Sequence, residues 1–116
     1  MLSFLIAALL LDPATMREPL ELTVRPQAAS SPATIRVSAR IVRHEANRRL
    51  TIRAESPRFL RSSSISLDGV ASVGALTRVF NELPPGEYEI EALLERNDGS
   101  RITKRSAVRV VGSERR

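Results

Sequence analysis

The sequence predicts an all-β protein in which two antiparallel sheets, with about seven short strands, pack as a sandwich. Apolar and polar residues alternate with a period of two along several segments after residue 19, which is typical of strands with one buried face. No helical period of useful length follows residue 19, and a parallel sheet would need helices between its strands. Turn residues separate the segments at short intervals, as in sandwich domains.

The length and composition fit one domain behind a short leader. The chain has 116 residues, of which 42% are apolar and 27% charged, in the range of a globular domain. We assign residues 1–19 to an apolar leader and linker, residues 20–112 to the sandwich, and residues 113–116 to a charged tail. Because aromatic residues make up only 3% and Trp is absent, the core must be built from aliphatic side chains.

Residues 2–11 form an apolar run that is interrupted only by Ser3. The run is too short for a membrane-spanning helix, which needs about 20 residues, and it matches the apolar centre of a signal peptide. No Lys or Arg precedes it and no clear cleavage site follows it, so a first strand or helix of the fold is the alternative. We expect export to the periplasm or outside the cell, possible association with the envelope, and no stable membrane span.

The first strands are expected at residues 20–25, 35–41 and 49–54, where the alternation is regular. The inward side chains of the clearest strand are Ile35, Val37, Ala39 and Ile41. Residues 27–32 are rich in Ser, Ala and Pro and predict a loop. A polar turn at residues 44–47 is short enough for the strands on either side of it to form a hairpin.

The middle of the chain is less regular. Ser56-Pro57 breaks the alternation, and residues 59–64 contain three consecutive serines without an apolar period. We expect an irregular segment there, then a short strand at residues 65–67 that ends at the turn Asp68-Gly69. Residues 70–74 predict a loop.

Three further strands complete the pattern. Residues 76–80 form a short strand, and residues 88–95 place apolar side chains on one face and mostly glutamates on the other. Residues 97–100, Asn-Asp-Gly-Ser, are a strong hairpin turn because these residues tolerate positive φ. The last strand is expected from residue 101 to about residue 111.

Residues 83–88, Leu-Pro-Pro-Gly-Glu-Tyr, resemble the corner before the penultimate strand of fibronectin type III-like and bacterial immunoglobulin-like domains. In such domains the Leu packs inward, Pro and Gly turn the chain, and the Tyr hydroxyl bonds to the backbone a few residues upstream. The chain has no core Trp and no Cys pair, so the resemblance implies a divergent bacterial relative. The structural residues that it singles out are Leu83, Pro85, Gly86, Tyr88 and, in the last hairpin, Gly99.

Charge is segregated along the chain. Residues 34–61 contain eight arginines against two glutamates, whereas residues 82–98 contain six carboxylates against one arginine. We expect the two stretches to pair across strands of one sheet rather than to leave a free basic face. In particular, Arg49 and Arg53 are expected to face the glutamates of residues 87–91.

No grouping of residues predicts catalysis, a cofactor or a metal. The chain has no Cys, and its only His, His44, lies in a turn with no second ligand or nucleophile at a telling spacing. Arg61 with the serines that follow could bind a phosphate or a sugar, but a solvated crossover explains them better. Asp68 and Asp98 each offer one carboxylate, whereas calcium takes six or more oxygens.

We therefore expect an exported, non-enzymatic immunoglobulin-like module with a protein-interaction or structural role at the cell envelope. Its partner is an unknown protein, and no nucleic acid is expected because no binding motif or aromatic platform is present. The alternative is a carbohydrate-binding module, for which Phe59 is the only aromatic residue in an expected loop. The third hypothesis is an enzyme that uses His44.

Overall fold

The computed structural model describes residues 18–69 and 74–112. The apolar leader up to residue 17, residues 70–73 of the expected loop and the charged tail at residues 113–116 lie outside the described residues. In the described part, no helix has the length and apolar character needed to cross a lipid bilayer.

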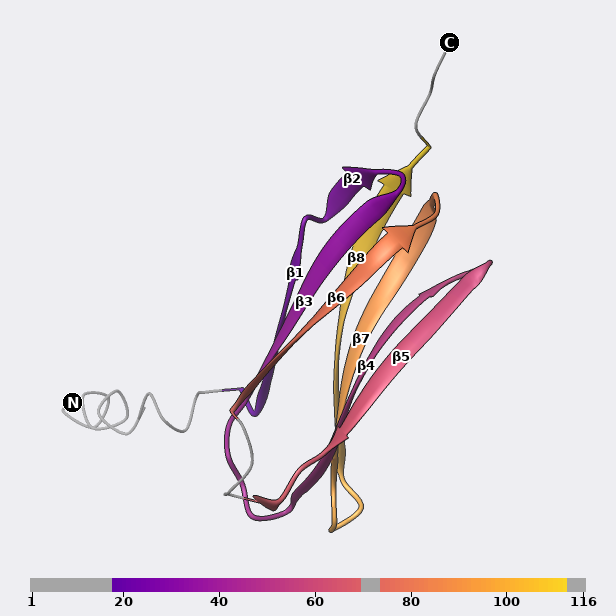
Figure 1. Cartoon of the computed structure of the whole chain (residues 1–116). Coiled ribbons are helices and arrows are strands. Elements are labelled where there is room, and N and C mark those ends of the chain that lie inside the picture. Colours follow the sequence, from indigo (N-terminus) through magenta and orange to yellow (C-terminus); the bar gives the residue numbers. More distant parts are fainter. Residues whose placement is uncertain (1–17, 70–73, 113–116) are drawn as a thin grey trace, which may run out of the picture.

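The described residues form eight strands in two sheets that face each other (Figure 1). The sheet of three strands has the order β1-β3-β6, with the bounds β1 (Leu20–Arg25), β3 (Ala33–Ile41) and β6 (Ala75–Leu83). The sheet of five strands has the order β2-β8-β7-β4-β5, with the bounds β2 (Ala28–Ser30), β4 (Asn47–Ser56), β5 (Phe59–Ser66), β7 (Gly86–Arg96) and β8 (Arg101–Val111). The expected all-β fold with two sheets is therefore confirmed.

The inner faces of the two sheets enclose one aliphatic core. Every second residue of β3 is buried, and Leu50, Ile52 and Ala54 of β4 face it from the other sheet with no exposed surface. Burying one large aliphatic side chain contributes about 1.5–3 kcal/mol, so this interior supplies most of the stability. Phe80 and Tyr88 are the aromatic members of the core.

The expected hairpin between residues 35–41 and 49–54 is wrong. β3 pairs with β1 and β6, whereas β4 pairs with β5 and β7, and residues 42–46 cross from one sheet to the other. Alternation shows only that both strands have an apolar face. Two such strands can lie side by side in one sheet or face each other across the core, and here they face each other.

Residues 59–64 are not irregular, because β5 runs from Phe59 to Ser66 and pairs with β4 along its whole length. Pro57 and Arg58 form the turn between the two strands. Residues 59–64 show no apolar period because β5 lies at the edge of its sheet, where the other sheet covers its inner face only in part. Backbone pairing with β4 forms the strand without that period.

Residues 27–32 are not entirely a loop, since β2 lies within them and raises the number of strands above the expected seven. β2 runs parallel to β8, with Ala28 opposite Arg109, so the expectation of wholly antiparallel sheets fails at this pair. The two X-Pro bonds that flank β2, Arg25-Pro26 and Ser31-Pro32, are cis. A strand of three residues is too short for a period-two pattern to reveal it.

Candidate functional site

The corner before β7 brings four of the expected structural residues together. Leu83 is fully buried, Pro85 is exposed, and Gly86 lies beside the side chains of Ser56 and Tyr88. The Tyr88 hydroxyl donates to the carbonyl oxygen of Pro84 at 2.6 Å. The Phe59 ring meets the Tyr88 ring edge to face, with centroids 5.6 Å apart. The corner thus joins β5, β7 and the core.

Gly99 lies at the opposite end, in the hairpin between β7 and β8, with a φ of 89°. This left-handed conformation suits Gly because a Cβ atom would be strained there. Asp98 accepts bonds from the backbone N–H and the hydroxyl of Ser100 at 2.9 and 2.6 Å. These bonds favour the charged carboxylate, and they lower the pKa of Asp98.

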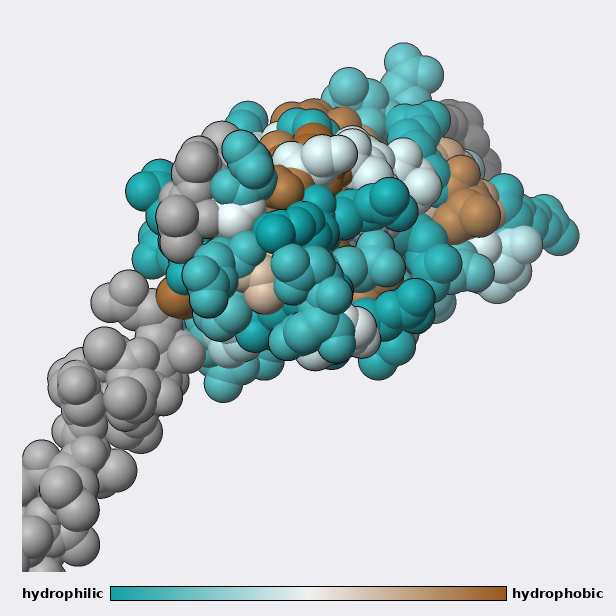
Figure 2. Space-filling model, turned by 90° about the horizontal axis from the view of Figure 1, so that it is seen from below, coloured by the Kyte–Doolittle hydropathy of each residue, from teal (hydrophilic) through white to brown (hydrophobic). Residues whose placement is uncertain are grey.

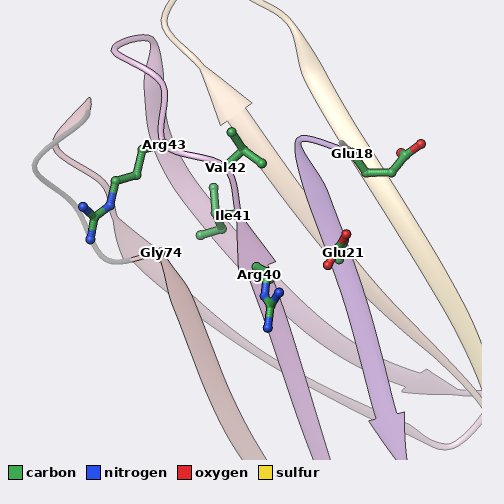
Figure 3. A pocket seen from close by; sticks show the side chains of 7 residues that line it. All are labelled: Glu18, Glu21, Arg40, Ile41, Val42, Arg43 and Gly74. Atoms are coloured by element: carbon green, nitrogen blue, oxygen red, sulfur yellow. The ribbon is translucent and has the colours of Figure 1, made fainter. Parts of the chain in front are cut away.

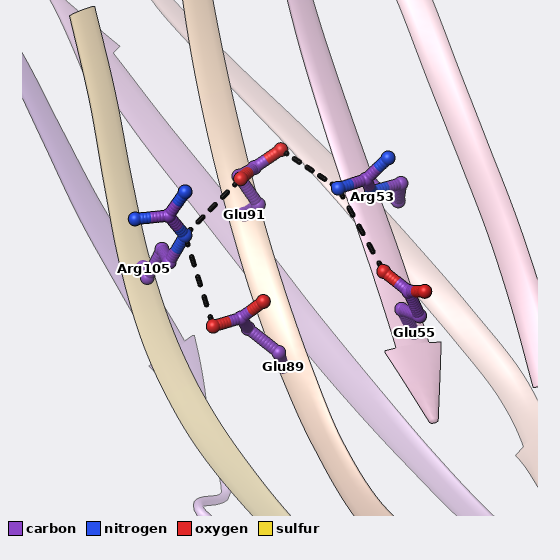
Figure 4. A network of polar contacts seen from close by, with 5 residues as sticks. All are labelled: Arg53, Glu55, Glu89, Glu91 and Arg105. Carbon is purple, nitrogen blue, oxygen red and sulfur yellow. Dashed lines mark hydrogen bonds and ion pairs between the residues drawn. The ribbon is translucent and has the colours of Figure 1, made fainter. Parts of the chain in front are cut away.

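The outer face of the five-stranded sheet carries a charge ladder. We define it as four glutamates of β7 with the arginines that they contact on β4 and β8, namely Glu87, Glu89, Glu91 and Glu95 with Arg49, Arg53, Arg101, Arg105 and Arg109. Glu91 lies at its centre, 3.2 Å from Arg53 of β4 and 3.2 Å from Arg105 of β8 (Figure 4). Arg53 also reaches Glu55 at 3.7 Å, and Arg105 reaches Glu89 at 3.7 Å. The contacts form a continuous chain across three strands.

The charge ladder continues towards both ends of the strands. Glu95 lies 3.9 Å from Arg49 and 3.7 Å from Arg101, and Glu87 lies 2.9 Å from Arg109. The expected pairing of β4 with β7 is therefore confirmed, and Arg53 meets Glu91 as expected. Arg49 meets Glu95 instead, which lies outside the expected residues 87–91. The arginines of β8 were not expected as partners, although they supply the second side of the ladder.

The outer face of the three-stranded sheet carries arginines that are not paired in this way with any described residue. We call it the arginine face and define it by Arg25, Arg36 and Arg40 with the hydroxyl residues Thr23, Ser38 and Thr77 between them. Arg25 and Arg36 stand directly opposite each other in the register of β1 and β3, and Arg40 stands opposite the exposed Glu21. Among the described residues, no carboxylate lies within ion-pair distance of these three exposed arginines.

The expected pairing of residues 34–61 with the acidic stretch is therefore wrong for Arg36 and Arg40. These two arginines belong to β3, which lies in the other sheet, and they point away from the acidic strand β7. The strand order separates them from the glutamates by the full thickness of the sandwich. A free basic face exists after all.

A shallow depression adjoins the arginine face at the start of β1 (Figure 3). Its lining comprises Glu18, Glu21, Arg40, Ile41, Val42, Arg43 and Gly74. Glu18 points away from Arg40 and towards β8 (Figure 3), where its carboxylate bonds to the ammonium of Lys104 at 2.6 Å. Charges of both signs line this open hollow, so it extends the arginine face rather than forming an enclosed ligand site.

Apolar surface does not define a docking site at the end of the molecule shown in Figure 2. Hydrophilic residues cover most of this end, and apolar atoms lie between them in small areas (Figure 2). The exposed large apolar side chains of the described residues are Leu60, Val79 and Val111, which belong to three different strands. Single apolar side chains of this kind are normal on a surface.

The remaining candidate residues do not assemble into a site. His44 is exposed, as expected, and its Nδ1 accepts a bond from the backbone N–H of Ala46 at 3.0 Å. Ser62 and Ser64 lie on the outer face of β5, where Ser64 bonds to Thr51 at 2.8 Å. Within residues 18–69 and 74–112, no three His, Cys, Asp or Glu residues are grouped so that they could hold a metal ion.

No protein-family model and no curated protein sequence matches the chain. Among solved structures, a superoxide reductase (neelaredoxin) from Ignicoccus hospitalis is similar, with a TM-score of 0.64 and 10% identity over 80% of this chain and 80% of that one. The soluble domain of PmoD from Methylocystis sp. has a TM-score of 0.53 and 14% identity, covering 78% of this chain and 90% of that one. Spo0M, a sporulation control protein from Bacillus subtilis, has a TM-score of 0.53 and 9% identity, covering 81% of this chain and 49% of that one. At these identities the likeness shows the fold alone.

The expectation that the chain is not an enzyme is corrected by this comparison. That expectation relied in part on a fold associated with binding and structural modules. The similar structures include an enzyme, superoxide reductase, with a similar fold. The sandwich is therefore a fold that supports catalysis in other proteins, and it gives no ground for excluding an enzyme.

Sequence reasoning missed the arginine face as the prominent surface feature. The signal was present, because Arg25, Arg36 and Arg40 all occupy outward positions of regular strands. What the sequence lacked was the identity of the neighbouring strands, which decides whether an outward arginine meets a glutamate.

Proposed function

We propose that the chain is an exported immunoglobulin-like module that binds an acidic surface of a second protein through the arginine face. In this role it serves as an interaction or structural component at the cell envelope. One observation carries the proposal: within the described residues, Arg25, Arg36 and Arg40 form no ion pair on one face, whereas the arginines of the charge ladder are paired on the other.

The electrostatics of the arginine face favour an acidic partner. Arg25 and Arg36 stand opposite each other, and like charges in that arrangement are unfavourable until an anion lies between them. Thr23, Ser38 and Thr77 add hydroxyl groups, and Ser38 lies 3.3 Å from Thr77. Carboxylates can accept bonds from both kinds of group, and guanidinium groups bind them in a bidentate way.

An acidic protein surface suits this face better than a nucleic acid or a sugar. Proteins that bind single-stranded nucleic acid without a sequence motif use exposed aromatic rings. Among the described residues, Phe80 and Tyr88 are buried, and Phe59 packs against Tyr88. Arginine, by contrast, is enriched in protein interfaces.

The immunoglobulin-like part of the proposal is supported by the strand order and by the corner before β7. A sheet of three strands packs on a larger sheet in which β7 lies between β8 and β4. The bond from Tyr88 to Pro84 has the form of a tyrosine corner, which is a feature of such domains.

Photo-crosslinking in cells tests the proposed binding face. A photoreactive amino acid replaces Ser38, at the centre of the arginine face, and in a matched protein it replaces Thr51, beside the charge ladder. We expect a covalent adduct with a second protein from position 38, and loss of that adduct when Arg36→Glu and Arg40→Glu are combined. Adducts from position 51 alone, or an adduct at position 38 that survives the charge reversal, contradict the proposal.

Export is tested separately by protease accessibility. A tagged full-length chain expressed in a bacterium should be cleaved by external protease after the outer membrane is opened, while a cytoplasmic marker stays intact. Protection equal to that of the marker contradicts export.

A further inference from the structure

The free side of β5 is a long and regular strand edge. β5 ends the order of the five-stranded sheet, and its eight residues pair with β4 from Phe59 to Ser66 without a register shift. No Pro interrupts β5, and no described strand pairs with its other side. Backbone N–H and C=O groups on such an edge can bond to a further extended segment.

The other edge strands have features that hinder pairing with a further strand. β2 has only three residues, and β6 pairs irregularly where Asn81 and Glu82 lie opposite Thr34. β1 ends just before Pro26, which cannot donate a ladder bond. Short strands, bulges and prolines are the usual protection of sheet edges. β5 has none of these three features.

Two guanidinium groups lie at the inner side of β5. Arg61 is exposed on that side and lies over the Phe59 ring, 5.0 Å from its centre. Arg78 reaches across from β6 and donates to the Ser63 hydroxyl at 2.9 Å. No carboxylate of the described residues pairs with either arginine.

These charges determine which segment can join the edge. A second copy of this chain would bring its own Arg61 to the same edge, and the like charges would repel. A strand with carboxylates at alternate positions directs them all to one side, and in the register that places them on the inner side they lie beside Arg61 and Arg78. Its other side chains would face Leu60 and the outward serines.

We propose that β5 binds an extended acidic segment of a partner protein as an additional strand, with alternate carboxylates directed at Arg61 and Arg78. Backbone hydrogen bonds to the edge supply the part of the affinity that does not depend on the sequence of the segment. The two arginines supply the preference for acidic residues. The site is separate from the arginine face, which lies on the outer side of the other sheet.

The test uses a synthetic peptide as long as β5 in which Glu and Thr alternate. A first control has the same composition with all glutamates in one block, and a second has N-methyl groups at alternate backbone nitrogens. Binding is measured by calorimetry, and amide hydrogen exchange by NMR locates the contact. We expect only the alternating, unmethylated peptide to slow exchange along β5.

Two variants decide the role of charge. Arg61→Glu should weaken the alternating peptide at least about tenfold, whereas Arg36→Glu on the arginine face should leave its affinity unchanged. Binding of the block or methylated peptide with equal affinity, protection that maps to β1 and β3, or self-association of the chain through β5 would overturn the proposal. None of these outcomes affects the crosslinking result at position 38, so the two proposals fail independently.

Discussion

At the scale of single residues, Tyr88 connects the corner before β7 to the core. The residue is 2% exposed, its ring contacts that of Phe59, and its hydroxyl donates to the carbonyl oxygen of Pro84. Burial raises the pKa of the phenol above its ordinary value of 10.0, and a hydrogen bond with Ser56 opposes the shift. The neutral phenol is therefore the form that the folded chain prefers.

Alkaline pH should destabilise the protein through this phenol. Since the unfolded chain releases the Tyr88 proton first, the free energy of unfolding should fall as pH rises above about 10, until the phenol also ionises in the folded state. Tyr88→Phe should lack this contribution. It should also lose about 1 kcal/mol at neutral pH, because the Pro84 carbonyl loses its donor.

Urea unfolding of both proteins between neutral and alkaline pH measures the difference. Tyr88 is the only Tyr, so the absorbance of tyrosinate reports its ionisation directly. Parallel pH profiles for the two proteins above pH 10 would show that the phenol does not contribute.

Within the described part of the chain, Glu82 is the one residue other than Gly that has a positive φ, at 56°. It lies in the bulge of β6 opposite Thr34, and its side chain is exposed. A left-handed conformation costs a residue with a Cβ about 1 kcal/mol. The bulge therefore stores strain in the backbone, and no ion pair between Glu82 and another described residue offsets it.

Glu82→Gly should raise the free energy of unfolding by about 0.5–1 kcal/mol, because Gly adopts positive φ without strain. Glu82→Ala is the matched control and should give no gain, since Ala keeps the Cβ atom. Thermal unfolding of the three proteins checks this. Equal stabilisation by Gly and Ala would point to the loss of the charge instead of relief of strain.

At the scale of elements, the charge ladder holds β4, β7 and β8 in register more than it stabilises the fold. Exposed ion pairs contribute about 0.2–1 kcal/mol each. Glu91 differs from the other glutamates because two arginines contact it and its side chain is only 15% exposed. Its removal leaves Arg53 and Arg105 facing each other across β7.

Glu91→Gln should lower the free energy of unfolding by about 1 kcal/mol, and the loss should shrink at high salt. Glu87→Gln is the control, because Glu87 pairs with Arg109 where both side chains are more than half exposed. It should have almost no effect. Chemical denaturation at low and high salt measures both, and a salt-independent loss at position 91 would indicate a packing effect.

At the scale of the whole molecule, the two outer faces differ in net charge although both are rich in arginine. On the outer face of the five-stranded sheet, glutamates neutralise the arginines. The net charge of +5 of the chain therefore comes mainly from residues outside this face. The arginine face concentrates part of that excess. Unscreened charge of one sign steers partners of the opposite sign.

Retention on a cation exchanger should reveal this difference. Arg36→Glu with Arg40→Glu changes the net charge by the same amount as Arg49→Glu with Arg53→Glu. We expect the first pair to elute at clearly lower salt, because its arginines form no ion pair with the described residues of the parent protein. The second pair breaks contacts in the ladder and leaves the arginine face intact, so equal elution of the two double variants would argue against a distinct basic face.

The extent of prediction from sequence differed between elements for physical reasons. β3 and β7 were predicted because one face of each is buried along its length, which imposes a strict apolar period. β5 was missed because it lies at an edge, where backbone pairing needs no apolar period. The corner at Pro84 and Tyr88 was predictable because its bond spans only four residues.

The sequence by itself determined the class of fold, since alternation, turn residues and the absence of helical periods are local properties of the chain. It also determined which side of most strands faces the core. Only the tertiary structure decided which strands are neighbours, and with that whether an outward arginine meets a glutamate or solvent. Strand order depends on contacts between residues far apart in the chain, and a period of two carries no information about them.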